Sequence, residues 1–154
     1  MKLEIPYDII DVADLTPEDQ ELIEAAKSAM EHAYAPYSQF HVGCSLRKET
    51  GKLITGNNQE NAAYPSGLCA ERVALFAAMS EEKSPIEAIA VVAQNSQGSI
   101  VEACPCGSCR QVMLEYATNQ KTPIRIFMVK SQSAVILIED VKWLLPFHFT
   151  KELL

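Results

Sequence analysis

Two short stretches decide the fold of this chain, Cys69-Ala70-Glu71-Arg72 and Cys104-Pro105-Cys106-Gly107-Ser108-Cys109. The first opens an apolar segment with helical periodicity that extends to residue 80, and the second leads into helical spacing up to residue 118. Free N–H groups and the positive end of the macrodipole at a helix start favour thiolate over thiol. Two helix starts that carry cysteines are therefore able to share one metal ion.

Strand and helix patterns alternate along the rest of the chain. A helix is predicted at residues 17–33, because Thr16 and Pro17 are typical of a helix start. Apolar alternation and apolar runs predict five strands, at residues 40–47, 52–56, 86–93, 123–129 and 134–138. This order predicts an α/β fold, a three-layer α-β-α domain whose helices cover both faces of a mixed five-stranded sheet. Residues 1–15 are predicted to be an irregular N-terminal lead before a single domain at residues 16–154.

Length, composition and charge exclude several classes of protein. The chain has 154 residues, of which 48% are apolar and 21% are charged, as expected for one globular domain. Its formal net charge of -7 disfavours contact with the phosphates of nucleic acids. The first residues lack the basic start and apolar middle of a signal peptide, and no apolar run approaches the roughly 20 residues of a membrane helix. A cytoplasmic protein without a membrane or nucleic-acid partner is predicted.

The spacing of the cysteines predicts a catalytic metal site. Five cysteines without a signal peptide favour metal binding or catalysis over disulfide bonds. Cys106 and Cys109 lie three residues apart, on one face of a predicted helix, and Cys69 opens the other helix. Three thiolates leave the fourth position of a tetrahedral zinc site open, as catalytic sites do. The carboxylate of Glu71 is then placed to meet water at the metal.

The cysteines have other possible roles at this stage. Cys104 would make the site a closed, structural one if it were the fourth ligand, although the proline that follows it is expected to direct it to the opposite side. The three cysteines are alternatively unrelated buried thiols, or two of them form a redox-active Cys-x-x-Cys pair, which leaves Cys69 unexplained. Cys44 lies on the apolar face of a predicted strand and is expected to be a core thiol.

Four stretches resemble the small, zinc-dependent cytidine deaminase family, with matching order and spacing from about residue 20 to residue 149. They are Ala33-Tyr34-Ala35-Pro36-Tyr37-Ser38-Gln39-Phe40-His41-Val42-Gly43, Asn58-Gln59-Glu60-Asn61-Ala62-Ala63-Tyr64, Cys69-Ala70-Glu71-Arg72 and Cys106-Gly107-Ser108-Cys109-Arg110-Gln111. The resemblance implies hydrolytic deamination of cytidine and 2'-deoxycytidine to uridine and 2'-deoxyuridine, with release of ammonia, in pyrimidine salvage.

The resemblance also implies a role for each residue of the metal site. Cys69, Cys106 and Cys109 hold one zinc ion per chain, which lowers the pKa of water at the metal. Glu71 is the catalytic proton shuttle, which takes a proton from that water and passes it to the ring nitrogen beside the amino-bearing carbon. Arg72 donates hydrogen bonds to the ligand thiolates and offsets their charge.

Contacts with a nucleoside substrate are implied for Phe40, Asn58, Glu60 and Ala70. The amide of Asn58 and the carboxylate of Glu60 together suit a sugar hydroxyl, which donates and accepts a hydrogen bond at once. Phe40 flanks the nucleoside, and Ala70 lies beside the proton shuttle in the same motif.

A C-terminal aromatic residue is implied to reach the base bound in a neighbouring subunit. Phe149 has the matching distance from Pro146, and Phe147 is the other candidate for this stacking residue. The resemblance therefore implies a homotetramer whose sites are shared across subunits.

Two rival functions differ in the features that they require. A deaminase of the same fold that acts on an aminonucleoside antibiotic such as blasticidin does not need Asn58 and Glu60, and one that acts on a polynucleotide conflicts with the acidic charge. A non-catalytic, zinc-stabilised interaction module requires a fourth ligand such as Cys104 and gives Glu71 no role.

Overall fold

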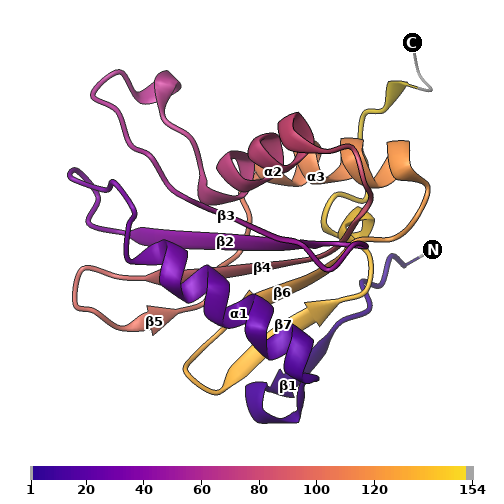
Figure 1. Ribbon diagram of the computed structural model, residues 1–154, viewed down its shortest axis with the longest axis horizontal. Coiled ribbons are helices and arrows are strands. Elements are labelled where there is room, and N and C mark those ends of the chain that lie inside the picture. Colours follow the sequence, from indigo (N-terminus) through magenta and orange to yellow (C-terminus); the bar gives the residue numbers. More distant parts are fainter. Residues whose placement is uncertain (1, 152–154) are drawn as a thin grey trace.

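The computed structural model describes residues 2–151, in which a mixed seven-stranded sheet lies between two layers of helices. The strands are β1 (Asp8–Asp11), β2 (His41–Lys48), β3 (Leu53–Asn57), β4 (Ile86–Gln94), β5 (Ile100–Val101), β6 (Arg125–Val129) and β7 (Ala134–Ile138). The helix α1 (Pro17–Met30) covers one face, and α2 (Ala70–Glu81) and α3 (Gly107–Gln120) cover the other (Figure 1). This arrangement confirms the predicted three-layer α/β fold.

The order of the strands is β1-β7-β6-β4-β2-β3, and β5 pairs with the end of β4. Only β4 and β6 run parallel among the paired strands of residues 2–151, since the other pairs are antiparallel. Three short 3-10 helices complete the described chain: η1 (Val12–Asp14), η2 (Tyr64–Ser66) and η3 (Val141–Leu144). No helix in this part of the chain combines the length and apolar character that crossing a bilayer requires.

The predicted count of five strands is wrong by two, because β1 and β5 were not expected. β1 lies within the N-terminal lead that was predicted to be irregular, and it pairs with β7 at the edge of the sheet. Asp8 and Asp11 flank Ile9 and Ile10, so this four-residue strand has the charged character of an edge strand and shows no alternation of apolar and polar residues. β5 spans two residues, which is too short for any alternation to appear in the sequence.

The first helix begins where it was predicted to begin but ends earlier. Thr16 Oγ1 accepts a hydrogen bond from the Asp19 amide (3.3 Å), and Pro17 is the first helical residue. The helix ends at Met30 instead of residue 33, because the chain turns so that the Tyr34 amide donates to the Asn58 carbonyl (3.0 Å). This turn carries residues 34–40 toward the loop after β3.

Two apolar layers hold the helices against the sheet. β4 contributes to both, with Ala88, Ala90 and Val92 facing α1 and Ile89 and Val91 facing α2 and α3. A strand that is buried on both faces reads as a continuous apolar run, which is the pattern that predicted it. The second layer also contains Cys44, which is fully buried as expected for a core thiol.

Glycines on β2 and β3 let the helices approach the sheet closely. A Cβ at Gly43 would lie 2.0 Å from the Ala26 carbonyl oxygen of α1, and a Cβ at Gly56 would lie 2.5 Å from the Ala74 amide nitrogen of α2. Side chains are excluded at both positions, because such separations are shorter than real contacts. Gly56 in particular places the first turns of α2, where Cys69 and Glu71 lie.

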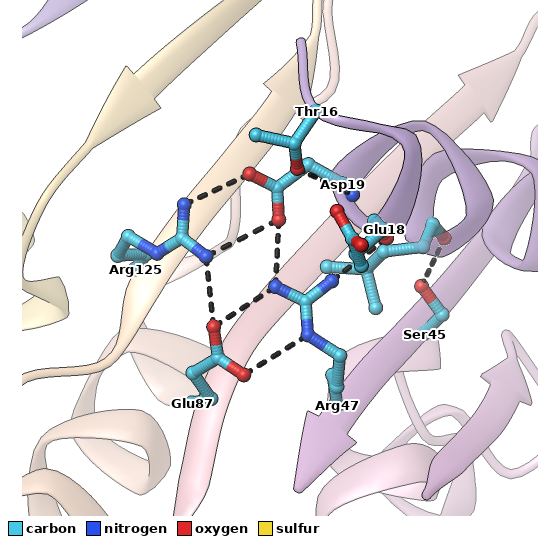
Figure 2. A network of polar contacts seen from close by, with 8 residues as sticks. Thr16, Glu18, Asp19, Ser45, Arg47, Glu87 and Arg125 are labelled. Carbon is cyan, nitrogen blue, oxygen red and sulfur yellow. Dashed lines mark hydrogen bonds and ion pairs between the residues drawn. The ribbon is translucent and has the colours of Figure 1, made fainter. Parts of the chain in front are cut away.

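An ion-pair network joins α1 to three strands, on the face away from α2 and α3 (Figure 2). Asp19 and Arg47 are buried in it, whereas Glu87 is partly exposed. Asp19 of α1 accepts hydrogen bonds from Arg47 Nη2 (2.7 Å) and Arg125 Nη1 (2.9 Å). Glu87 of β4 accepts from the same two side chains, from Arg47 Nε at 3.0 Å and Arg125 Nη2 at 2.9 Å. Because each carboxylate is shared by both guanidinium groups, the network fixes the first turn of α1 on the sheet.

Replacing Asp19 is expected to destabilise the fold in a pH-dependent way. Burial raises the pKa of Asp19, but hydrogen bonds and charges of Arg125 and Arg47 outweigh it and lower the pKa below its usual value of 3.8. Such a carboxyl stabilises the folded state above the pKa of the unfolded chain, and this contribution is lost as pH falls through the folded pKa. Asp19→Asn is therefore expected to lower the free energy of unfolding by about 3 kcal/mol at neutral pH.

Urea unfolding at neutral pH and in acid well below pH 3.8, where the folded carboxyl is also protonated, measures this difference. Glu81→Gln is the matched control, because Glu81 pairs with Lys52 on the exposed surface and such a pair is worth about 1 kcal/mol or less. A difference between wild type and Asp19→Asn that is the same at both pH values would contradict the assigned role of the carboxylate charge.

Candidate active site

The three predicted metal ligands lie at the N-terminal ends of α2 and α3. Cys69 is the N-cap residue of α2, Cys106 is the N-cap residue of α3, and Cys109 lies in the first turn of α3. The two helices lie side by side on one face of the sheet (Figure 1). Both helix starts therefore present free backbone N–H groups and the positive end of the macrodipole to the same small region.

The three sulfur atoms have the spacing of a zinc site. Cys69 Sγ lies 3.8 Å from Cys106 Sγ, and Cys106 Sγ lies 3.5 Å from Cys109 Sγ. Tetrahedral zinc with Zn–S bonds of about 2.3 Å requires sulfur atoms about 3.8 Å apart. These residues form the one cluster of three or more metal-ligating side chains found in the described part of the chain. The donor set and its geometry thus fit a zinc ion with three protein ligands.

Cys104 lies outside this cluster. Its Sγ atom lies 3.8 Å from Glu102 Oε1, and the residue is exposed. The described residues therefore place three sulfur atoms at the site, and three protein ligands are typical of a catalytic zinc site.

The thiols of the cluster ionise unequally. A hydrogen bond from the Cys109 thiol, with smaller help from Arg72 and Cys106, lowers the pKa of Cys69 to about 5, although burial opposes it. The same contact, together with burial and the negative charge of Glu71, raises the pKa of Cys109. A bound cation would favour the deprotonated form of all three sulfurs, which is the form that binds metal.

Arg72 lies against the sulfur of Cys69. Its Nη2 atom is 3.8 Å from Cys69 Sγ, and this contact raises the pKa of the guanidinium. The Nε atom of Arg72 is buried without a hydrogen-bond partner among the described residues. A cation in this position offsets the negative charge that three thiolates accumulate.

Glu71 is a buried carboxyl group beside the sulfur cluster. Its exposed fraction is 4%, and its side chain lines the same cavity as Cys69 and Cys106. Burial raises the pKa of Glu71, and the negative charge of Cys69 raises it further. A carboxyl group with a raised pKa exchanges protons nearer to neutral pH, which is what general acid–base catalysis requires.

A cavity of about 340 Å³ brings most of the predicted substrate contacts together with this chemistry. Besides Glu71 and the two cysteines, it is lined by Phe40, Asn58, Glu60 and Ala70. Pockets for small organic ligands span about 300–1,000 Å³. The cavity is therefore large enough for one small substrate, with an acid, a metal-binding cluster and polar groups on its wall.

The C-terminal aromatic residues are not in this cavity within one chain. Phe149 is 57% exposed, and its carbonyl oxygen accepts a hydrogen bond from Gln111 Nε2 (2.9 Å). Phe147 is 94% exposed. The arrangement of a single chain thus leaves both rings directed to the outside of the molecule.

The structure also places three polar residues, Ser38, Glu102 and Cys104, on the wall of the cavity. Sequence reasoning gave Ser38 and Glu102 no role, and it considered Cys104 only as a metal ligand directed to the opposite side. Ser38 lies in a stretch that was singled out, but its position depends on hydrogen bonds to residues about twenty positions away. Glu102 and Cys104 lie on the segment between β5 and α3, whose path is not encoded in any local periodicity. Proximity to Cys106 was the only signal that pointed to them.

Comparisons with known proteins agree with this geometry. The profile of the "Cytidine and deoxycytidylate deaminase zinc-binding region" matches residues 16–123. The cytidine deaminase of Sporosarcina psychrophila is 42% identical over 135 residues, covering 86% of this chain and 92% of the relative. That of Halalkalibacterium halodurans is 43% identical over 133 residues, covering 86% and 95%.

A solved structure gives the same result. The crystal structure of cytidine deaminase from Burkholderia pseudomallei matches with a TM-score of 0.75 and 42% identity, over 88% of this chain and 100% of that chain. With a matching zinc-binding region, close sequence relatives and a shared fold, the chain belongs to the cytidine deaminase family.

Proposed function

We propose that this chain is a zinc-dependent hydrolase that deaminates cytidine and 2'-deoxycytidine to uridine and 2'-deoxyuridine. The observation that carries the proposal is one cavity lined by a buried acid, Glu71, by ligands of a three-sulfur cluster and by polar side chains that suit a sugar. Residues 16–154 are proposed as the catalytic domain, preceded by the lead at residues 1–15. Pyrimidine salvage is the process that such a reaction serves.

The proton transfers of this reaction are assigned to Glu71. When held by Cys69, Cys106 and Cys109, one zinc ion per chain supplies the Lewis acid that makes water a nucleophile near neutral pH. The raised pKa of Glu71 suits it to take up a proton and to deliver it to the ring nitrogen beside the amino-bearing carbon. Once the water oxygen has bonded to the amino-bearing carbon, Glu71 takes the remaining proton from that oxygen and delivers it to the amine, so that the C–N bond breaks and ammonia leaves as the carbonyl forms. Arg72 keeps the Cys69 sulfur ionised throughout.

The remaining wall of the cavity is assigned to nucleoside binding. Asn58 and Glu60 are proposed to hold a sugar hydroxyl, Phe40 to flank the nucleoside, and Ala70 to contact it from the first turn of α2. These groups give the site a preference for nucleosides over the free base, because cytosine has no sugar hydroxyl.

A homotetramer with shared sites is the proposed assembly. A second, more open cavity of about 570 Å³ borders the first and shares Ser38, Asn58, Glu60 and Cys69 with it. Its rim carries Tyr64, which is 78% exposed. The exposed rings of Phe149 and Phe147 suit a role in a neighbouring subunit, where one of them is proposed to stack on the base.

A cytoplasmic location is proposed from the chemistry of the three ligand cysteines. The ligand thiols bind metal only in the reduced state, and the cytoplasm keeps thiols reduced.

Turnover of four compounds tests the proposed function. Purified, zinc-loaded protein is incubated with cytidine, 2'-deoxycytidine, cytosine and blasticidin S, and the loss of absorbance and the metal content are measured. We expect both nucleosides to be deaminated at one zinc per chain, and cytosine and blasticidin S to be left unchanged. No turnover of any compound by protein that holds zinc would favour the interaction module instead.

A further inference from the structure

Ser38 lies at the centre of the hydrogen bonds that shape the bend before β2. Its Oγ atom donates to Glu60 Oε1 and accepts from the Phe40 amide (3.0 Å). Between them, Gln39 has a φ of 54°, in the left-handed region that residues other than glycine seldom adopt. A side chain that bonds to both sides of such a residue holds the bend in one conformation.

Glu60 is left with little freedom by these contacts. Its Oε2 atom accepts hydrogen bonds from the Tyr37 amide (2.9 Å) and the Ser38 amide (3.2 Å). Its Oε1 atom accepts from the Ser38 hydroxyl. Since a carboxylate oxygen has two acceptor sites, Oε2 is fully used and Oε1 keeps one site for a further donor. The hydrogen bond from Ser38 therefore determines the direction in which this last site points.

Asn58 is constrained in the same way. Its Oδ1 atom accepts from the Val42 amide (2.8 Å), and its Nδ2 atom donates to the Phe40 carbonyl (2.9 Å). The second N–H of Nδ2 remains as a donor. Asn58 and Glu60 thus keep one donor and one acceptor toward the cavity that both line, which is the requirement of a single hydroxyl group.

We propose that Ser38 is a positioning residue, which aims Glu60 at a ring hydroxyl of the nucleoside sugar. This inference rests on the proposed function, because it names the residue that orients the sugar contact. Without the Ser38 hydroxyl, Oε1 gains a second open site, and the carboxylate is held through Oε2 alone, so that Oε1 can turn toward water. Binding of a sugar hydroxyl weakens, whereas the proton transfers at Glu71 are untouched.

The test compares a substrate with an analogue that lacks both ring hydroxyls. For Ser38→Ala we expect the KM for cytidine to rise about tenfold, as for loss of one oriented hydrogen bond to a charged group. The kcat is expected to change by less than about twofold, because the reacting groups do not move. The inhibition constant of 2',3'-dideoxycytidine against cytidine turnover is expected to stay at the wild-type value, since it has no ring hydroxyl for Glu60 to bind.

Two further variants separate positioning from damage to the fold. Ser38→Thr keeps the hydroxyl and is expected to retain the wild-type KM, and Ser96→Ala, in an exposed turn, is the matched control. Thermal unfolding of each variant is recorded. Should Ser38→Ala unfold, Ser38→Cys gives the same comparison, because it keeps the shape of the side chain, with a slightly larger atom, and replaces the hydroxyl with a weak donor.

Each result supports or overturns the assignment. A KM that rises for cytidine in Ser38→Ala, with an unchanged inhibition constant of the dideoxy analogue and a wild-type KM in Ser38→Thr, supports it. If the KM for cytidine and the inhibition constant of the dideoxy analogue rise equally, Ser38 only maintains the shape of the cavity. If neither constant rises, Glu60 does not need Ser38 for its orientation. Both results overturn the assignment, while the proposed function stands. A wild-type protein that does not turn over cytidine overturns the proposed function itself.

Discussion

Glu71→Gln is expected to lower the kcat for cytidine by about 10²–10⁴-fold, the contribution that a positioned general acid–base makes. Glutamine keeps the size of the side chain and the path of α2, but its amide neither accepts nor releases a proton near neutral pH as a carboxyl group does. Because the sulfur atoms come from other residues, the zinc content of the variant is expected to equal that of wild type. The KM is expected to change little, since Glu71 acts on the reacting atoms and not on the sugar.

Steady-state kinetics and metal analysis of the same preparations test this prediction. Glu81→Gln is the matched control, because Glu81 lies at the far end of the same helix with its side chain 56% exposed. Its kcat and zinc content are both expected to stay at wild-type values. If Glu71→Gln keeps its kcat, Glu71 is not the proton shuttle; if it loses zinc along with activity, the carboxyl group acts through the metal site.

Gly43→Ala is expected to have the largest effect on stability. A Cβ at this position would lie 2.0 Å from the Ala26 carbonyl oxygen and 2.6 Å from the Met30 amide nitrogen. Both are backbone atoms of α1, which cannot move aside as the end of a flexible side chain can. The helix must therefore shift as a unit, and we expect the free energy of unfolding to fall by about 3 kcal/mol or more.

Urea unfolding measured by circular dichroism checks this expectation. Gly107→Ala is a suitable control, because a Cβ there has no heavy atom within 4 Å and the position begins α3. Alanine is the better helix former, so no loss of stability is expected for this variant. Unfolding midpoints of Gly43→Ala and Gly107→Ala that agree with each other would show that α1 does not pack as closely as Gly43 implies.

The parts of the fold that depend on local patterns were predictable from the sequence. The start of α1 followed from Thr16 and Pro17, and the central strand β4 followed from its apolar run. The pairing of β1 with β7 was not predictable, because that strand is short, acidic and joined to a partner more than a hundred residues away. Local periodicity carries no information about such a distant partner.

The same distinction applies to the site. Cysteine spacing and helix starts are local properties, and they predicted the sulfur cluster that the structure brings together. The roles of Ser38 and of the Asp19 network depend on which distant residues meet, since Ser38 bonds to Glu60 and Asp19 bonds to Arg125. The proposed stacking of Phe149 or Phe147 on a base requires contacts between chains, which no local pattern in the sequence encodes.

The placement of the ion-pair network on one face of the sheet and the sulfur cluster on the other has a consequence for how this protein tolerates change. Substitutions far apart and without shared partners usually have additive effects on stability. Substitutions at Asp19 that lower the stability, and substitutions elsewhere in the α1 layer that raise it, are therefore expected to change the melting temperature without changing the pH optimum of catalysis.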